Sequence, residues 1–174
     1  MRTTSLPILY VRAAAGFRAR GWLVAGPLGI PVALGRAGIR ANKREGDGGT
    51  PRGRFKLVRL LWRADRTPRP RTLLPVRRIG RNDGWCENPA DRLYNRPTVI
   101  KGSGDRLWRD DRLYDFIIEL DHNTRPRVAG RGSAVFIHVA RPGFGPTAGC
   151  VALEAGRLRR LLERLGPNTR IQIG

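Results

Sequence analysis

Two side chains in the last third of the sequence could together carry out covalent chemistry. His138 ends an apolar run, and Cys150 follows it after a Gly/Pro-rich loop of eleven residues, 139–149. A cysteine thiol has a pKa of about 8.5 and is only a few per cent thiolate at neutral pH, so an imidazole within hydrogen-bonding reach is the usual means of activating it. The pair is therefore typical of a thiol nucleophile with its base. The alternative is a small cysteine that only packs in the core.

The residues around this pair suit such a role. Thr147 and Ala148 precede Gly149, where the backbone can bend sharply, and the backbone N–H groups of this segment could hold an oxyanion. His138 is carried by Ala134–Ile137, a continuous apolar run that predicts a strand buried on both faces. A base on such a strand would be held more rigidly than one at the tip of a loop.

The same stretch resembles a known enzyme family. Ser133–Leu153 is similar to the signature of the YkuD-type L,D-transpeptidases, in which a strand-borne histidine is followed by a loop and then by Ser/Thr-x-Gly-Cys. The corresponding residues are His138, Thr147, Gly149 and Cys150.

A second segment upstream supports the resemblance. Lys43–Phe55, KREGDGGTPRGRF, resembles the family's K-x-G-D-G-x-T-P-x-G-x-F stretch, and the two motifs occur in the family's order. Its residues predict a glycine-rich turn in which Thr50-Pro51 fixes an extended segment that leads into a strand at Phe55–Val58. The segment could equally be no more than a hairpin connection.

Three features depart from the family pattern. The loop 139–149 is shorter than usual, Ala148 stands where the family often has a histidine, and Ala152 stands where it usually has an arginine or asparagine. Arg141, in the shortened loop, could supply the missing positive charge and favour a thiolate or a substrate carboxylate. The alternative is a solvated loop arginine.

The resemblance implies an enzyme that acts on peptidoglycan stem peptides. Cys150 would attack the carbonyl of the third-position diaminopimelate of a tetrapeptide and release D-alanine, with His138 as base. An acceptor amine would then take the acyl group. It would come from another diaminopimelate or, in a divergent compact proteobacterial group that this chain also resembles, from the first-position L-alanine. With water as acceptor, the activity would instead be that of an L,D-carboxypeptidase trimming tetrapeptides to tripeptides in wall recycling.

The remaining candidate residues have weaker signals. Trp85 and Tyr94 could form a wall of the cleft, or belong to a loop packed over the sheet. A disulfide between Cys86 and Cys150 would consume the nucleophile, so we expect none in the active form. His122 follows a strand in a turn-like setting, where we expect a surface role. With two histidines, two cysteines and no close ligand spacing, we expect no metal site and no cofactor.

The composition adds a rival interpretation. The 34 Lys and Arg residues against 14 Asp and Glu give a net charge of +20, which favours binding to polyanions. A basic nucleic-acid-binding protein is therefore the alternative from another class. However, the arginines are spread along the chain and no nucleic-acid motif occurs, so we expect no specific nucleic-acid partner. Four tryptophans could offer stacking surfaces: Trp22, Trp62, Trp85 and Trp108.

Short apolar runs between Gly/Pro breakers predict a mainly β fold. Leucines at helical spacing predict one short helix between Glu154 and Leu165, directly after the cysteine, and Asn88–Tyr94 could form another with Pro89 at its first position. We expect one domain, 1–174, with the mixed β-sandwich that the family implies. The predicted strands are Ile8–Val11, Trp22–Ala25, Ile30–Leu34, Phe55–Trp62, Phe116–Leu120, Ala134–Val139 and Arg170–Ile173.

The sequence gives conflicting signals about the compartment. The family implies the periplasm or cell envelope, yet Arg12, Arg18 and Arg20 interrupt any apolar stretch of a signal peptide. A cytoplasmic enzyme acting on recycled wall fragments is the alternative. No run approaches the ~20 apolar residues of a membrane span, so we expect none.

Overall fold

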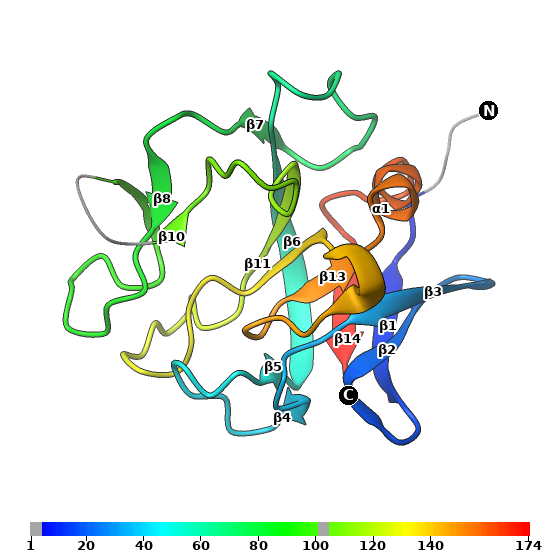
Figure 1. Ribbon diagram of the computed structural model, residues 1–174, viewed down its shortest axis with the longest axis horizontal. Helices are drawn as coiled ribbons and strands as arrows, with labels where there is room; N and C mark the ends of the chain where they lie inside the picture. Colours follow the sequence, from blue (N-terminus) through cyan, green and yellow to red (C-terminus); the bar gives the residue numbers. More distant parts are fainter. Residues whose placement is uncertain (1–4, 101–104) are drawn as a thin grey trace.

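Nine strands form a main sheet that closes on itself (Figure 1). The computed structural model describes residues 5–100 and 105–174. The strands of the main sheet are β1 (Ile8–Ala14), β2 (Phe17–Ala25), β3 (Leu28–Ala33), β6 (Gly53–Trp62), β7 (Val76–Arg78), β11 (Phe116–Leu120), β12 (Phe136–Val139), β13 (Val151–Leu153) and β14 (Arg170–Ile173). Their order is β11-β12-β13-β3-β2-β1-β14-β6-β7, and the pairing of β6 with β11 completes the ring. Each predicted strand overlaps one of these, so the mainly β prediction is confirmed.

The closed sheet surrounds an apolar inner core. Strands β1, β2 and β14 send alternate residues inward, as a half-buried strand does. Strands β11 and β12 are buried along their whole length, because their other face is covered too. This double burial explains why both are mostly apolar rather than alternating, with Glu119 and His138 as their polar residues. The inner core includes Leu9, Val11, Leu23, Leu60, Ile118, Ile137, Val151, Leu153, Leu158 and Ile171.

One α-helix packs on the inner core. Helix α1 (Ala155–Leu162) begins at Glu154, whose carboxylate accepts from the N–H groups of Gly156 and Arg157, at 2.8 and 2.9 Å. Leu158, Leu161 and Leu162 form its buried face. The predicted helix is thus confirmed, but β13 lies between Cys150 and α1, because Val151–Leu153 pairs with β12 and β3.

A smaller side sheet covers the outer face of β11 and β12. It consists of β8 (Asp83–Trp85), β9 (Pro97–Val99) and β10 (Asp105–Arg106), in the order β10-β8-β9, and stands apart from the main sheet in Figure 1. Between the two lies an outer cluster: Leu61, Ile79, Trp85, Leu107, Ile117, Ala134, Phe136 and Cys150. Two further short strands, β4 (Ile39–Arg40) and β5 (Thr50–Pro51), pair in parallel, and a 3₁₀ turn, η1, spans Pro142–Phe144.

The second predicted helix is wrong. Asn88–Tyr94 forms consecutive turns, in which Asn88 Oδ1 accepts from the Ala90 N–H (3.0 Å) and Asp91 Oδ1 accepts from the Leu93 N–H (2.8 Å). These side-chain bonds offer the backbone an alternative to a helix that is too short to nucleate alone.

In the part of the chain that the structure describes, no helix has both the length and the apolar character needed to span a membrane.

Candidate active site

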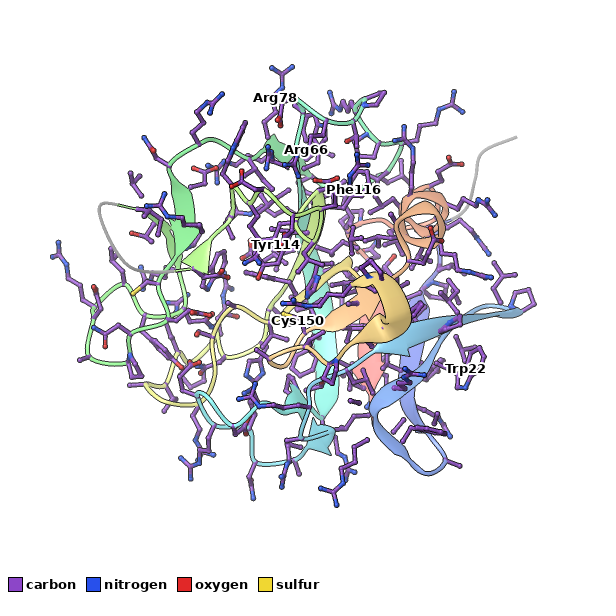
Figure 2. All side chains as sticks on the ribbon, in the orientation of Figure 1. Trp22, Arg66, Arg78, Tyr114, Phe116 and Cys150 are labelled. Atoms are coloured by element: carbon purple, nitrogen blue, oxygen red, sulfur yellow. The ribbon has the colours of Figure 1, made fainter. Side chains whose placement is uncertain are left out.

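Cys150 lies at the end of the loop that leads into β13, in the outer cluster (Figure 2). Its Sγ accepts from the Phe136 N–H at 3.4 Å and donates to the carbonyl of Ala134 at 3.2 Å. The residue is 8% exposed, and this burial raises the pKa of the thiol to about 12. The resting cysteine is therefore a protonated thiol, which would need a base in order to act as a nucleophile.

His138 is suited to be that base. It lies on β12, opposite Ala152 of the parallel strand β13, and shares the outward face of β12 with Phe136. Its Nδ1 lies 2.9 Å from the carbonyl oxygen of Val139, which can only accept, so Nδ1 carries a proton. Burial lowers the pKa of the imidazole to about 4. The ring is therefore neutral at physiological pH and holds a lone pair on Nε2.

The two side chains line one pocket of about 260 Å³. In this structure the thiol donates to Ala134 rather than to His138, so proton transfer requires the Cys150 side chain to leave that carbonyl. The edge of Tyr114 packs on the His138 ring, with 5.4 Å between ring centres, and limits its orientation. The pocket is lined by Glu87, Asp105, Arg109, Leu113, Tyr114, His138, Arg141, Gly145, Pro146, Thr147, Ala148, Cys150 and Ala152.

Thr147 holds the cysteine loop in place. Its N–H donates to Leu34, and its hydroxyl donates to the Cys150 carbonyl at 2.7 Å while accepting from the Gly149 N–H at 3.1 Å. The backbone N–H groups of Thr147 and Gly149, which are two of the predicted oxyanion donors, thus already donate hydrogen bonds within the protein. Ala148 is exposed and lines the pocket.

Gly149 is required by its conformation and by its surroundings. Its φ of +149° is one that residues with a side chain rarely adopt. A Cβ at this position would lie 2.8 Å from the carbonyl oxygen of Gly49, which belongs to the upstream glycine-rich segment. The two sequence motifs therefore touch at the residue before Cys150.

The upstream segment is more than a connection between strands. Asp47 accepts from the Gly49 N–H (2.7 Å), from Lys43 Nζ (2.5 Å) and from the Arg44 N–H (2.8 Å), which fixes the turn. Although burial opposes its ionisation, these hydrogen bonds lower the pKa of Asp47. Lys43 is only 7% exposed and lies beside Gly149. The segment thus supports the loop that positions Cys150.

The other predicted site residues have different locations. Arg141 lines the pocket, at the start of η1. Trp85 and Tyr94 are buried and lie outside the pocket lining. Trp85 donates to Asn95 Oδ1 (3.0 Å) and packs edge-on against Phe136, so it joins the side sheet to β12.

Tyr94 links three segments that are distant in sequence. Its hydroxyl is hydrogen bonded to Glu45 and accepts from the Gly132 N–H at 3.0 Å.

His122, expected at the surface, is partly buried, with Nε2 3.1 Å from the carbonyl of Arg131 and its ring against Phe55. Tyr94 and His122 therefore both contribute to packing between segments and lie outside the pocket lining.

Sequence reasoning missed an acidic side of the pocket. Glu87 and Asp105, from the side sheet, line it together with Tyr114, whose hydroxyl donates to Asp105 Oδ2 at 3.1 Å. Burial raises the pKa of Asp105 and of Tyr114. The sequence did contain one signal for this acidic side: the chain has 14 acidic residues against 34 basic ones, so each carboxylate is a candidate for a specific role.

Cys86 and Cys150 are both free thiols. Within residues 5–100 and 105–174, no group of three or more His, Cys, Asp or Glu residues is placed to hold a metal ion.

Comparison with known families agrees with this arrangement. The model of the L,D-transpeptidase catalytic domain matches residues 19–173, so the chain is an enzyme domain of the L,D-transpeptidase type. It belongs to the YkuD family, whose members act on peptidoglycan stem peptides. No curated protein and no solved structure shows significant similarity to the chain.

Proposed function

We propose that this protein is a peptidoglycan L,D-transpeptidase in which Cys150 is the nucleophile and His138 the general base. The observation that carries the proposal is that a protonated thiol and a neutral imidazole with a free Nε2 line the same pocket. The pair would work by general-base transfer rather than as a preformed thiolate–imidazolium pair.

The first half-reaction forms a thioester. As Sγ attacks the carbonyl carbon of the third-position diaminopimelate, Nε2 of His138 takes the thiol proton and a tetrahedral intermediate forms. The carbon–nitrogen bond to D-alanine then breaks, and the imidazolium returns the proton to the departing amine. The products are the acyl-enzyme and free D-alanine.

The second half-reaction transfers the acyl group. An acceptor amine, from diaminopimelate or from first-position L-alanine, attacks the thioester carbon and gives a proton to His138. The carbon–sulfur bond breaks, and the thiol recovers its proton. Hydrolysis by water in place of the amine would make the enzyme an L,D-carboxypeptidase.

Backbone N–H groups are the proposed oxyanion donors. The oxyanion would lie at Ala148–Cys150, and the Gly149 N–H could contribute only after it leaves Thr147 Oγ1. Arg141 would bind a substrate carboxylate at the pocket. We propose the periplasm or cell envelope as the compartment, because peptidoglycan stem peptides are found there.

Chromatography of the products tests the reaction. The wild type, Cys150→Ala and the control Cys86→Ala are each incubated with purified disaccharide-tetrapeptide. Crosslinked dimers from the wild type and Cys86→Ala, and none from Cys150→Ala, are the expected result. Tripeptide monomers alone would assign the carboxypeptidase activity. An unchanged substrate would refute both.

A further inference from the structure

The pocket of Cys150 has an acidic wall formed by the side sheet. Glu87 follows β8, Asp105 lies in β10, and the pairing of Trp85 with Asp105 brings the two segments together. Neither carboxylate forms an ion pair with a described cation. In a chain with 34 basic and 14 acidic residues, two carboxylates beside the nucleophile are unexpected unless they serve a ligand.

The acidic wall is connected to the catalytic base. Tyr114 donates to Asp105 Oδ2 and packs edge-on against His138, so the position of the carboxylate is fixed relative to the imidazole. Glu87 is exposed and also lines the pocket. Burial raises the pKa of Asp105, although the hydrogen bond from Tyr114 and the nearby charge of Arg109 partly oppose this effect.

A positive charge faces the same space from another element. Arg141 lies at the start of η1 and has no ion pair among the described residues, whereas Arg109 is held by Asp111 at 2.6 and 2.9 Å. The pocket therefore presents two carboxylates from the side sheet and one uncompensated guanidinium from the loop after β12.

His138 opens onto the same space. Its Nε2 has no hydrogen-bond partner in the described part of the chain, and the residue lines the pocket. Because no fully buried side-chain nitrogen or oxygen among the described residues lacks a partner, Nε2 is open to the pocket and accessible to a bound group.

We propose that Glu87 and Asp105 bind the free ammonium group of the donor diaminopimelate while Arg141 binds its free carboxylate. The inference rests on the proposed function, since diaminopimelate in a stem peptide ends in an amino-acid zwitterion. Charge-assisted hydrogen bonds to both ends would fix the donor carbonyl relative to Cys150. They would also select against stems that lack either charge.

Three synthetic tetrapeptide donors test this assignment. One contains diaminopimelate, one contains 2-aminopimelate, which lacks the ammonium, and one contains lysine, which lacks the carboxylate. The measured quantity is kcat/KM for formation of the acyl-enzyme. For the wild type, loss of either charge should lower kcat/KM on the order of 10-fold.

Variants assign each charge to its partner. In Glu87→Gln and Asp105→Asn, the preference for diaminopimelate over 2-aminopimelate should shrink to within about 3-fold, because the contact is already lost. The penalty for lysine should persist in these variants and disappear in Arg141→Gln. Asp110→Asn removes an exposed carboxylate of a neighbouring segment outside the pocket and should behave as the wild type.

The outcomes separate this inference from the proposed function. A wild type that acylates with diaminopimelate and 2-aminopimelate equally well, or acidic variants that keep the full preference, would overturn the inference and leave the transpeptidase proposal standing. No acylation by any of the three donors would overturn both. Thermal unfolding of each variant verifies that it is folded.

Discussion

The inner core and the outer cluster are built by the same strands but serve different purposes. On β12, Ile137 points to the inner core, while Phe136 and His138 point to the side sheet. The inner core is apolar throughout, whereas the outer cluster contains the Cys150 thiol and borders charged side chains. The comparison shows how one buried strand can contribute to stability with one face and to chemistry with the other.

The difference also explains the protonation states at the site. The side sheet removes water from the outer face of β12, so burial raises the pKa of Cys150 and lowers that of His138. Both groups are therefore neutral at physiological pH. On a strand whose outer face was open to water, burial would neither raise the pKa of the cysteine nor lower that of the histidine.

The largest effect is expected from removing the base on the outer face. His138→Gln should lower the rate of acyl-enzyme formation by about 10²–10⁴-fold, because the neutral imidazole that lines the pocket with the thiol is the proposed proton acceptor. Stopped-flow or quenched-flow mass measurement gives the rate. His122→Gln, at the other histidine, is the control. Equal rates for both variants would remove His138 from the mechanism.

Adjacent leucines on β6 compare the two regions directly. Leu60 belongs to the inner core and Leu61 to the outer cluster, and both are essentially fully buried. Each change to alanine should lower the free energy of unfolding by about 2–5 kcal/mol, measured by urea denaturation. Only Leu61→Ala should also lower the activity of the folded protein, because its neighbours line or support the pocket. A larger loss of activity in folded Leu60→Ala than in folded Leu61→Ala would contradict this division between the inner core and the outer cluster.

A smaller effect is expected in the turn that supports the cysteine loop. Asp47→Asn should cost about 1 kcal/mol at pH 7, since charge-assisted hydrogen bonds from Lys43 and two backbone groups weaken. The folded pKa of Asp47 lies below the ordinary value of 3.8, so its contribution is full above that value and is lost as the pH falls through the folded pKa.

Unfolding free energies between pH 7 and pH 3 check this dependence. The difference between the wild type and Asp47→Asn should narrow toward pH 3, while Glu163→Gln, an exposed carboxylate next to α1, should show little difference at any pH. A difference that widens with acid would show that the Asp47 carboxylate does not stabilise the turn.

The main sheet and the shared location of Cys150 and His138 could be predicted because their signals are local. Phe116–Leu120 and Ala134–Val139 are mostly apolar segments, and a cysteine after Thr-Ala-Gly is conspicuous in a chain with two cysteines. The predicted buried strand is confirmed over Phe136–Val139, which includes His138, whereas Ala134 and Val135 are buried but precede the strand.

The acidic wall and the side sheet could not be predicted, because their signals are not local. Strands β8 and β10 have three and two residues, too few to show periodicity. Glu87 and Asp105 meet only through the pairing of those strands, and the closure of the main sheet depends on β6 meeting β11. The alternation of polar and apolar residues does not specify such long-range partners.

The most direct test of the central claim is the intact mass of the wild type and of Cys150→Ala after mixing with disaccharide-tetrapeptide. We predict that the wild type alone gains the mass of the donor less D-alanine, and that peptide digestion locates the adduct on Cys150. An adduct of that mass on Cys150→Ala, its location on Cys86, or no adduct and no released D-alanine in the wild type would contradict the account.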